Sequence, residues 1–243
     1  MWRGLEHVLR PGVGPLPWTL VGLLVGWWIY VPLHELLHAA GCVLTGGEVT
    51  RLEIARAYGG DLYAAVFDFV VPESEYAGRL SGFSTFGNDW IYLATDLAPF
   101  LLTVFPGVWA LRRAVAHERP FFYGFWLPFA LAPFLSLTGD AYEIGSILVT
   151  QISPWSAQAD LLRSDDLFLW IDTHRDRSGI PWAGAVLATL IGAVWAAGTY
   201  ALGSLTSTAL GRGPIPALDF SEADPSAADP GHEEPRPAAT TEP

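Results

Sequence analysis

The chain has 243 residues and a formal net charge of −12 at pH 7. Half of the residues (51%) are hydrophobic and only 16% are charged, whereas about a quarter are charged in an average soluble domain, so the composition is typical of a membrane protein. The acidic balance argues against nucleic acid as a partner, because binding to phosphates needs a basic surface.

The first apolar segment runs from Trp18 to about Leu44, which is longer than the roughly 20 residues that a membrane-spanning helix needs. It is too long for the apolar region of a signal peptide and lacks a convincing cleavage site, so we expect it in the mature protein. Its second half contains His34, Glu35 and His38. Ionisable groups within a span cost about 2.5–3.5 kcal/mol each on insertion scales and usually mark a functional site.

These three residues form the pattern His-Glu-x-x-His within "YVPLHELLHAAGCVL". Residues four apart lie on one face of a helix, so His34 and His38 can offer ring nitrogens to one zinc ion. Glu35 is rotated by roughly 100° from His34, which places it close to the ion but not bound to it. From there Glu35 can take a proton from a water activated by zinc and pass it to a leaving amine.

The next segment has the alternating pattern of strands rather than of helices. "EVTRLEIARAY" alternates polar and apolar residues, and "LYAAVFDFVV" is a second strand-like run that ends at Pro72. The sequence therefore predicts a small membrane-associated β-hairpin at about residues 48–72, between the first two spans.

Three further apolar segments follow, at about residues 90–111, 120–152 and 181–210. Prolines and Gly139 in the second of these predict a kinked or interrupted helix. In the last, small residues recur at every fourth position and predict close helix packing: Gly184, Ala188, Gly192 and Ala196. We therefore predict a mainly α, multi-pass integral membrane protein with about four transmembrane helices in the lipid bilayer.

The polar regions complete the predicted organisation. Within residues 151–179, "DLLRSDDLFLWI" is expected to form a short interfacial helix. Residues 1–210 are predicted to form one membrane-embedded domain, and residues 211–243, which are rich in Pro, Ala, Asp and Glu, a disordered acidic tail. His232 in that tail is a poor candidate for a metal ligand.

Two histidines need at least one more protein ligand, and an acidic residue in a span is the best source. Asp140, which follows the apolar half of the third span, is the first choice. Glu143 lies three residues further on the same helical face and could ligate the ion, orient a ligand or face an aqueous loop. Asp96 could hydrogen-bond a ligand imidazole, line a water path or make a polar contact between helices.

These residues resemble the site-2 protease group of intramembrane zinc metalloproteases. The segment "HELLHAAGCVLTGGEVTRLEI" followed by "YGGD" is similar to the family's motif helix and the strand-forming loop after it. "LPFALAPFLSLTGD" takes the place of the family's proline-containing stretch before an Asp ligand, so the resemblance also implies Asp140 as the third ligand. It implies a zinc cofactor, a membrane-protein substrate and cleavage of that substrate within or near the bilayer.

The leading interpretation is an intramembrane zinc metalloendopeptidase in which His34, His38 and Asp140 bind zinc and Glu35 is the general base and acid. The main alternative is a catalytically inactive membrane scaffold that retains the fold. The ending "TGDAYEIGS", which replaces the family's Asp-Gly, favours the scaffold, whereas the intact Glu35 favours the enzyme. A transporter ranks last, because the chain has only four convincing spans and no paired half-repeats.

Overall fold

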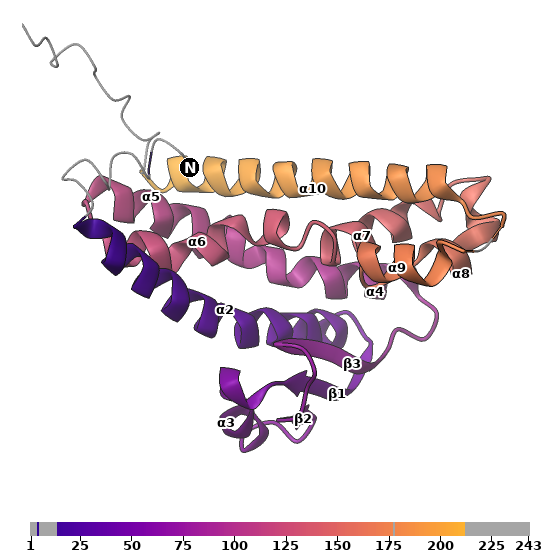
Figure 1. Ribbon diagram of the computed structural model, residues 1–243, viewed down its shortest axis with the longest axis horizontal. Coiled ribbons are helices and arrows are strands. Elements are labelled where there is room, and N and C mark those ends of the chain that lie inside the picture. The colour runs from indigo at the N-terminus through magenta and orange to yellow at the C-terminus, as the bar shows by residue number, and fades with distance from the viewer. Residues whose placement is uncertain (1–3, 5–13, 177, 212–243) are drawn as a thin grey trace, which may run out of the picture.

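The computed structural model describes residue 4 and residues 14–176 and 178–211, and Figure 1 shows a mainly helical protein with one small sheet. Within this part of the chain, four helical segments are long and apolar enough to cross a membrane by length and composition: Pro15–Leu44, Asp89–Ala116, Pro120–Val149 and Trp182–Ala209. They match the four predicted spans. The predicted acidic tail, including His232, lies outside the described residues from position 212 onward.

Helix α2 (Pro15–Leu44) packs along helix α6 (Pro120–Leu135) at very short range. Gly22 and Gly26 of α2 face the backbone of α6, and Gly124 of α6 faces the backbone of α2. A Cβ atom on any of the three would fall on a carbonyl oxygen of the opposite helix, because the backbones are in contact there. Because these three glycines have no side chains, α2, which carries His34, Glu35 and His38, can pack this close to α6.

The second segment is an interrupted helix composed of α4 (Asp89–Leu97), η2 (Ala98–Phe100), η3 (Thr103–Gly107) and α5 (Val108–Ala116). Its break falls at Phe105, whose backbone is extended (φ −159°, ψ 131°). Phe105 precedes Pro106, and the proline ring disfavours helical geometry at the residue before it. The N-terminus of α4 is capped by the Asn88 side chain, which accepts a hydrogen bond from the Trp90 N–H.

The third segment is also interrupted, as the sequence predicted. Helix α6 ends at Leu135, and α7 (Asp140–Val149) begins after a short non-helical connection. Asp140 is therefore the first residue of a helix rather than a mid-helix residue. The partial positive charge at a helix N-terminus favours a carboxylate at this position.

Helix α10 (Trp182–Ala209) covers the bundle on the side opposite α2, with α6 and α7 between them (Figure 1). The four small residues predicted to form a packing stripe are all buried: Gly184, Ala188, Gly192 and Ala196. Gly192 faces the Ala141 carbonyl of α7, and Gly145 of α7 faces the Ala188 carbonyl. The predicted close packing is confirmed, and its partner is the helix that begins with Asp140.

The β-hairpin predicted at residues 48–72 is wrong in its pairing. Strand β1 (Glu48–Ile54) is the centre of a three-stranded sheet, parallel to the short β2 (Val70–Val71) and antiparallel to β3 (Gly78–Ser84). After β1 come a 3-10 turn, η1 (Arg56–Tyr58), and Gly59 at φ +82°, from which the short helix α3 (Gly60–Ala64) starts. That helix is part of the crossover that a parallel pair requires, so most of "LYAAVFDFVV" is not a strand.

The predicted interfacial helix at about residues 160–171 is two helices. After η4 (Trp155–Gln158), α8 (Ala159–Leu162) ends at Leu162 and α9 (Leu167–His174) follows. The Asp166 carboxylate caps α9 by accepting hydrogen bonds from the N–H groups of Phe168 and Leu169. Arg163 holds the connection against α4 through two hydrogen bonds to Asp89, at 2.6 and 2.8 Å. Asp165 and Asp166 of this connection line the cavity described in the next subsection.

Candidate metal centre

The three predicted ligands come together from two helices. His34 and His38 lie one turn apart on α2, and Asp140 reaches them from the start of α7. The Nε2 atoms of the two histidines are 3.1 Å apart, and Asp140 Oδ2 lies 3.1 Å from His34 Nε2. One possible ligand atom from each residue falls within 4.8 Å of the others, so these residues could hold a metal ion.

Both imidazole rings are oriented by contacts on their outer nitrogens. His38 Nδ1 lies 2.9 Å from the carbonyl oxygen of Thr95 on α4. A carbonyl can only accept, so Nδ1 carries the proton and Nε2 presents a lone pair toward His34 and Asp140. His34 Nδ1 is 2.6 Å from the Tyr30 hydroxyl, one turn earlier on α2. Such outer contacts fix the ring orientation of metal-binding histidines.

A glycine allows the Thr95 contact to form. Gly41 lies close to His38 on α2, and a Cβ there would be 2.7 Å from the Ala94 carbonyl of α4 and 2.6 Å from the Ala98 Cβ. Any larger residue would push α4 outward. The close approach of the two helices thus brings the Thr95 carbonyl within hydrogen-bond distance of His38.

Asp140 provides the clearest sign that the site fits a cation. Its Oδ2 atom is buried and forms no hydrogen bond apart from its 3.1 Å approach to His34 Nε2. A buried carboxylate oxygen that lacks donors is costly, and a metal ion would supply a positive partner for it. Two imidazole nitrogens with one carboxylate oxygen are a common ligand set for such an ion.

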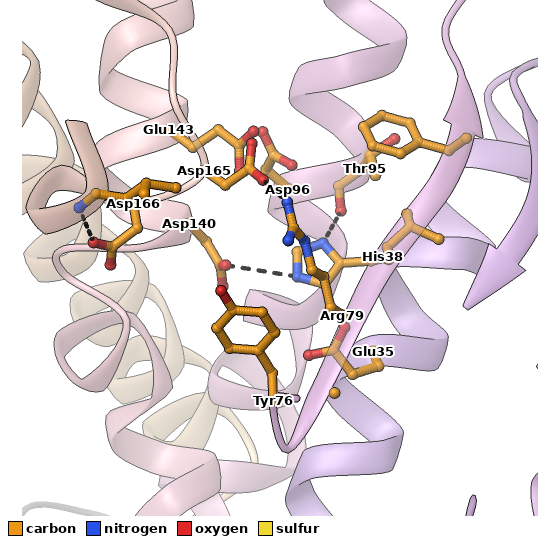
Figure 2. A pocket seen from close by; sticks show the side chains of 14 residues that line it. Glu35, His38, Tyr76, Arg79, Thr95, Asp96, Asp140, Glu143, Asp165 and Asp166 are labelled. Atoms are coloured by element: carbon orange, nitrogen blue, oxygen red, sulfur yellow. Dashed lines mark hydrogen bonds and ion pairs between the residues drawn. The ribbon is translucent and has the colours of Figure 1, made fainter. Parts of the chain in front are cut away.

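Glu35 lies on the wall of a cavity of about 350 Å³ that His38 and Asp140 also line (Figure 2). Strand β3 forms the neighbouring wall. The Leu80 N–H donates a hydrogen bond to the Glu35 carboxylate, and a Cβ at Gly78 would collide with the Glu35 side chain. The strand therefore holds Glu35 in place, next to the ligands but outside the ligand group.

The two other acidic candidates lie in the same cavity but not among the ligands. Asp96 and Glu143 are 3% and 8% exposed and line its wall. Glu143 accepts a hydrogen bond from the Tyr92 hydroxyl of α4. The imidazole of His38 is bonded to the Thr95 carbonyl, so the predicted contact of Asp96 with a ligand ring is absent from the described structure.

Sequence reasoning missed several residues around the centre. Tyr30 precedes His34 by four positions, so its place on the same helical face could have been inferred. Thr95 acts through its backbone, which no side-chain pattern reveals. Tyr76, whose ring points toward Asp140, and Arg79 reach the cavity from the segment around β3 (Figure 2), and their sequence context carries no metal-site signal.

Replacing Tyr30 by Phe is expected to weaken metal binding by about 10- to 100-fold, because His34 loses the contact that orients its ring. The measurement is the zinc affinity of the purified protein in detergent, by competition with a fluorescent chelator. Tyr63→Phe is the matched control, since Tyr63 packs in the sheet region away from the centre. Equal zinc affinities of the Tyr30 variant and the unmodified protein would contradict a role for this hydroxyl.

Comparison of the chain with protein-family models, with curated proteins and with solved structures finds no match.

Proposed function

We propose that this protein is a membrane-embedded zinc endopeptidase that hydrolyses peptide bonds of membrane-protein substrates. The observation that carries the proposal is the meeting of three possible ligands, His34, His38 and Asp140, with Glu35 at one cavity. Four helical segments long and apolar enough to span a bilayer support a membrane location for that cavity.

Zinc is the ion we propose for the centre. His34 and His38 would supply nitrogen ligands and Asp140 an oxygen ligand. Catalytic zinc sites commonly have three protein ligands of these types and keep a fourth position open. When bound, zinc supplies Lewis acidity, which polarises a carbonyl oxygen and lowers the pKa of water to about 7.

Glu35 is proposed as the group that moves the proton. Its carboxylate lies at the cavity wall and is held by the Leu80 N–H, so it is positioned before a substrate arrives. It would accept a proton from the attacking water and donate that proton to the nitrogen of the departing amine. His38 keeps its own proton on Nδ1, bonded to Thr95, and so does not compete for this role.

The first test is the metal content of the purified protein. We expect about one zinc per chain, the stoichiometry of a three-ligand centre, with the zinc largely lost in His34→Ala and Asp140→Ala. Glu143→Gln is the matched acidic control and is expected to keep its zinc, because Glu143 is not in the ligand group. Zinc-loaded protein should then cleave members of a set of synthetic single-span peptides, with the new ends detected by mass spectrometry.

The outcomes separate the candidate functions. Zinc retained by Asp140→Ala and lost by Glu143→Gln would transfer the third ligand to Glu143. A well-folded protein that takes up no zinc when it is supplied would refute the enzyme and leave the membrane scaffold as the function of this fold.

A further inference from the structure

A pair of buried acidic side chains lies in the cavity beyond the candidate ligands. Asp96 comes from α4 and Glu143 from α7, and we call them the acidic pair. Figure 2 shows their carboxyl groups pointing toward one another, on the side of the cavity away from Glu35. The metal centre and the acidic pair therefore line a single continuous cavity.

No cation is in direct contact with the acidic pair among the described residues. Asp96 is 3% exposed, and its Oδ2 atom is buried without a hydrogen-bond donor. Glu143 accepts a hydrogen bond from Tyr92, which is a neutral group. Within residues 14–176 and 178–211, neither carboxyl group forms an ion pair. Burying such acceptors without a partner is costly, so their retention at a cavity wall calls for a ligand that supplies donors.

The charge of the cavity favours a cation. Its lining includes six acidic side chains, namely Glu35, Asp96, Asp140, Glu143, Asp165 and Asp166, and one arginine, Arg79. Arg79 is engaged at the rim, where its Nη2 atom lies 2.8 Å from Asp165 Oδ2, and both side chains are about half exposed. A cavity lined by one sign of charge attracts ligands of the opposite sign.

The apolar walls of the cavity favour an organic cation with an apolar stem. Leu80 and Phe83 of β3 and Leu169 of α9 line the cavity together with the carboxyl groups. Lysine and arginine side chains combine an aliphatic stem with a charged end. A second metal ion fits less well, because among the described residues only His34, His38 and Asp140 form a group of three or more ligands.

We propose that Asp96 and Glu143 form a specificity subsite for a basic side chain, lysine or arginine, of the substrate, next to the peptide bond cleaved at the metal centre. This inference rests on the proposed peptidase function, because it places the scissile bond at His38, Asp140 and Glu35. The cavity of about 350 Å³ is at the lower end of the size range of small-ligand sites, which suits one side chain and its adjoining backbone.

The experiment measures binding and needs no catalysis. Three probes share a dansyl group and a hydroxamate, which chelates the metal, and differ only in their amino acid: lysine, norleucine or glutamate. Each is titrated into zinc-loaded protein in detergent. Because the chelating group is common, the ratio of two affinities reports the side-chain subsite alone. We expect the lysine probe to bind at least about tenfold more tightly than the norleucine probe, since hydrogen bonds between charged groups are stronger than those between neutral groups. The glutamate probe should bind most weakly.

Two variants test whether the acidic pair causes the preference for the lysine probe over the norleucine probe. Asp96→Asn and Glu143→Gln keep the side-chain shape and should reduce the ratio of lysine to norleucine affinity toward one. Asp68→Asn, an exposed acidic residue outside the cavity, should leave the ratio unchanged. The probe series on the unmodified protein stands by itself if a variant does not fold.

The results distinguish failure of the subsite from failure of the proposed function. Equal affinities of the lysine and norleucine probes would overturn the subsite, as would a preference that survives both variants. If none of the probes binds, the metal centre, and the subsite with it, is refuted. A lysine preference that depends on Asp96 in a protein that cleaves no peptide would uphold the subsite and refute the peptidase.

Discussion

Replacing Glu35 by Gln is expected to lower the rate of peptide-bond cleavage by about 10²- to 10⁴-fold, the usual contribution of a positioned general acid–base group. The amide has nearly the shape of the carboxylate but cannot accept the proton of the attacking water. Zinc content should stay the same, because Glu35 lies outside the ligand group formed by His34, His38 and Asp140. The measurement pairs the cleavage rate on a single-span peptide with zinc content per chain.

Glu48→Gln is the control for this prediction, because Glu48 is an exposed glutamate at the start of β1. Its cleavage rate should equal that of the unmodified protein. An undiminished rate in Glu35→Gln would show that another group moves the proton. A loss of both zinc and activity would instead assign Glu35 a part in binding the metal.

Replacing Gly124 by Ala is expected to lower the free energy of unfolding by about 1–3 kcal/mol, the usual cost of inserting a methyl group where there is no space. The new Cβ would meet the Thr19 carbonyl of α2. The two helices would have to separate, and α2 carries three of the four residues proposed for catalysis. The measurement is the midpoint of thermal unfolding in detergent, followed by tryptophan fluorescence, which should fall by several degrees.

Gly198→Ala is the matched control on α10. A Cβ there meets nothing within 4 Å, and alanine favours a helix over glycine, so the unfolding midpoint should be unchanged or raised. Equal unfolding midpoints for the two variants would contradict backbone contact between α2 and α6 as the feature that fixes the position of α2.

Local sequence patterns were sufficient for the helices and for part of the site. Apolar runs of sufficient length predicted all four membrane-span candidates, because the length and composition of a helix are properties of one continuous segment. His34 and His38 share a face through helical periodicity alone. The prolines and Gly139 before Asp140 predicted an interrupted helix, and an interruption is present, but α6 continues through Pro128 and Pro133 and the break lies at residues 136–139.

The sheet shows where local pattern was insufficient. The run from Leu62 to Val71 has the composition of a strand, yet only its last two residues pair with β1. The longer partner, β3, contains Gly78 and Gly82, and no strand was predicted there. Strand pairing depends on which segments the fold brings alongside each other. Here β3 lies beside Glu35, and a side chain larger than glycine at position 78 would collide with Glu35.

The sequence by itself therefore determined the four apolar helical segments and two residues that could bind a metal ion, His34 and His38, with Asp140 as the first choice for a third ligand and Glu143 left open. Only the tertiary structure decided how those residues are used. Contacts between distant segments orient His38 through Thr95, place β3 against Glu35 and bring Asp96 and Glu143 into the cavity of the candidate metal centre. The reason is physical: helical periodicity is set by neighbours along the chain, whereas a hydrogen-bond partner or a cavity wall is set by packing between segments far apart in it.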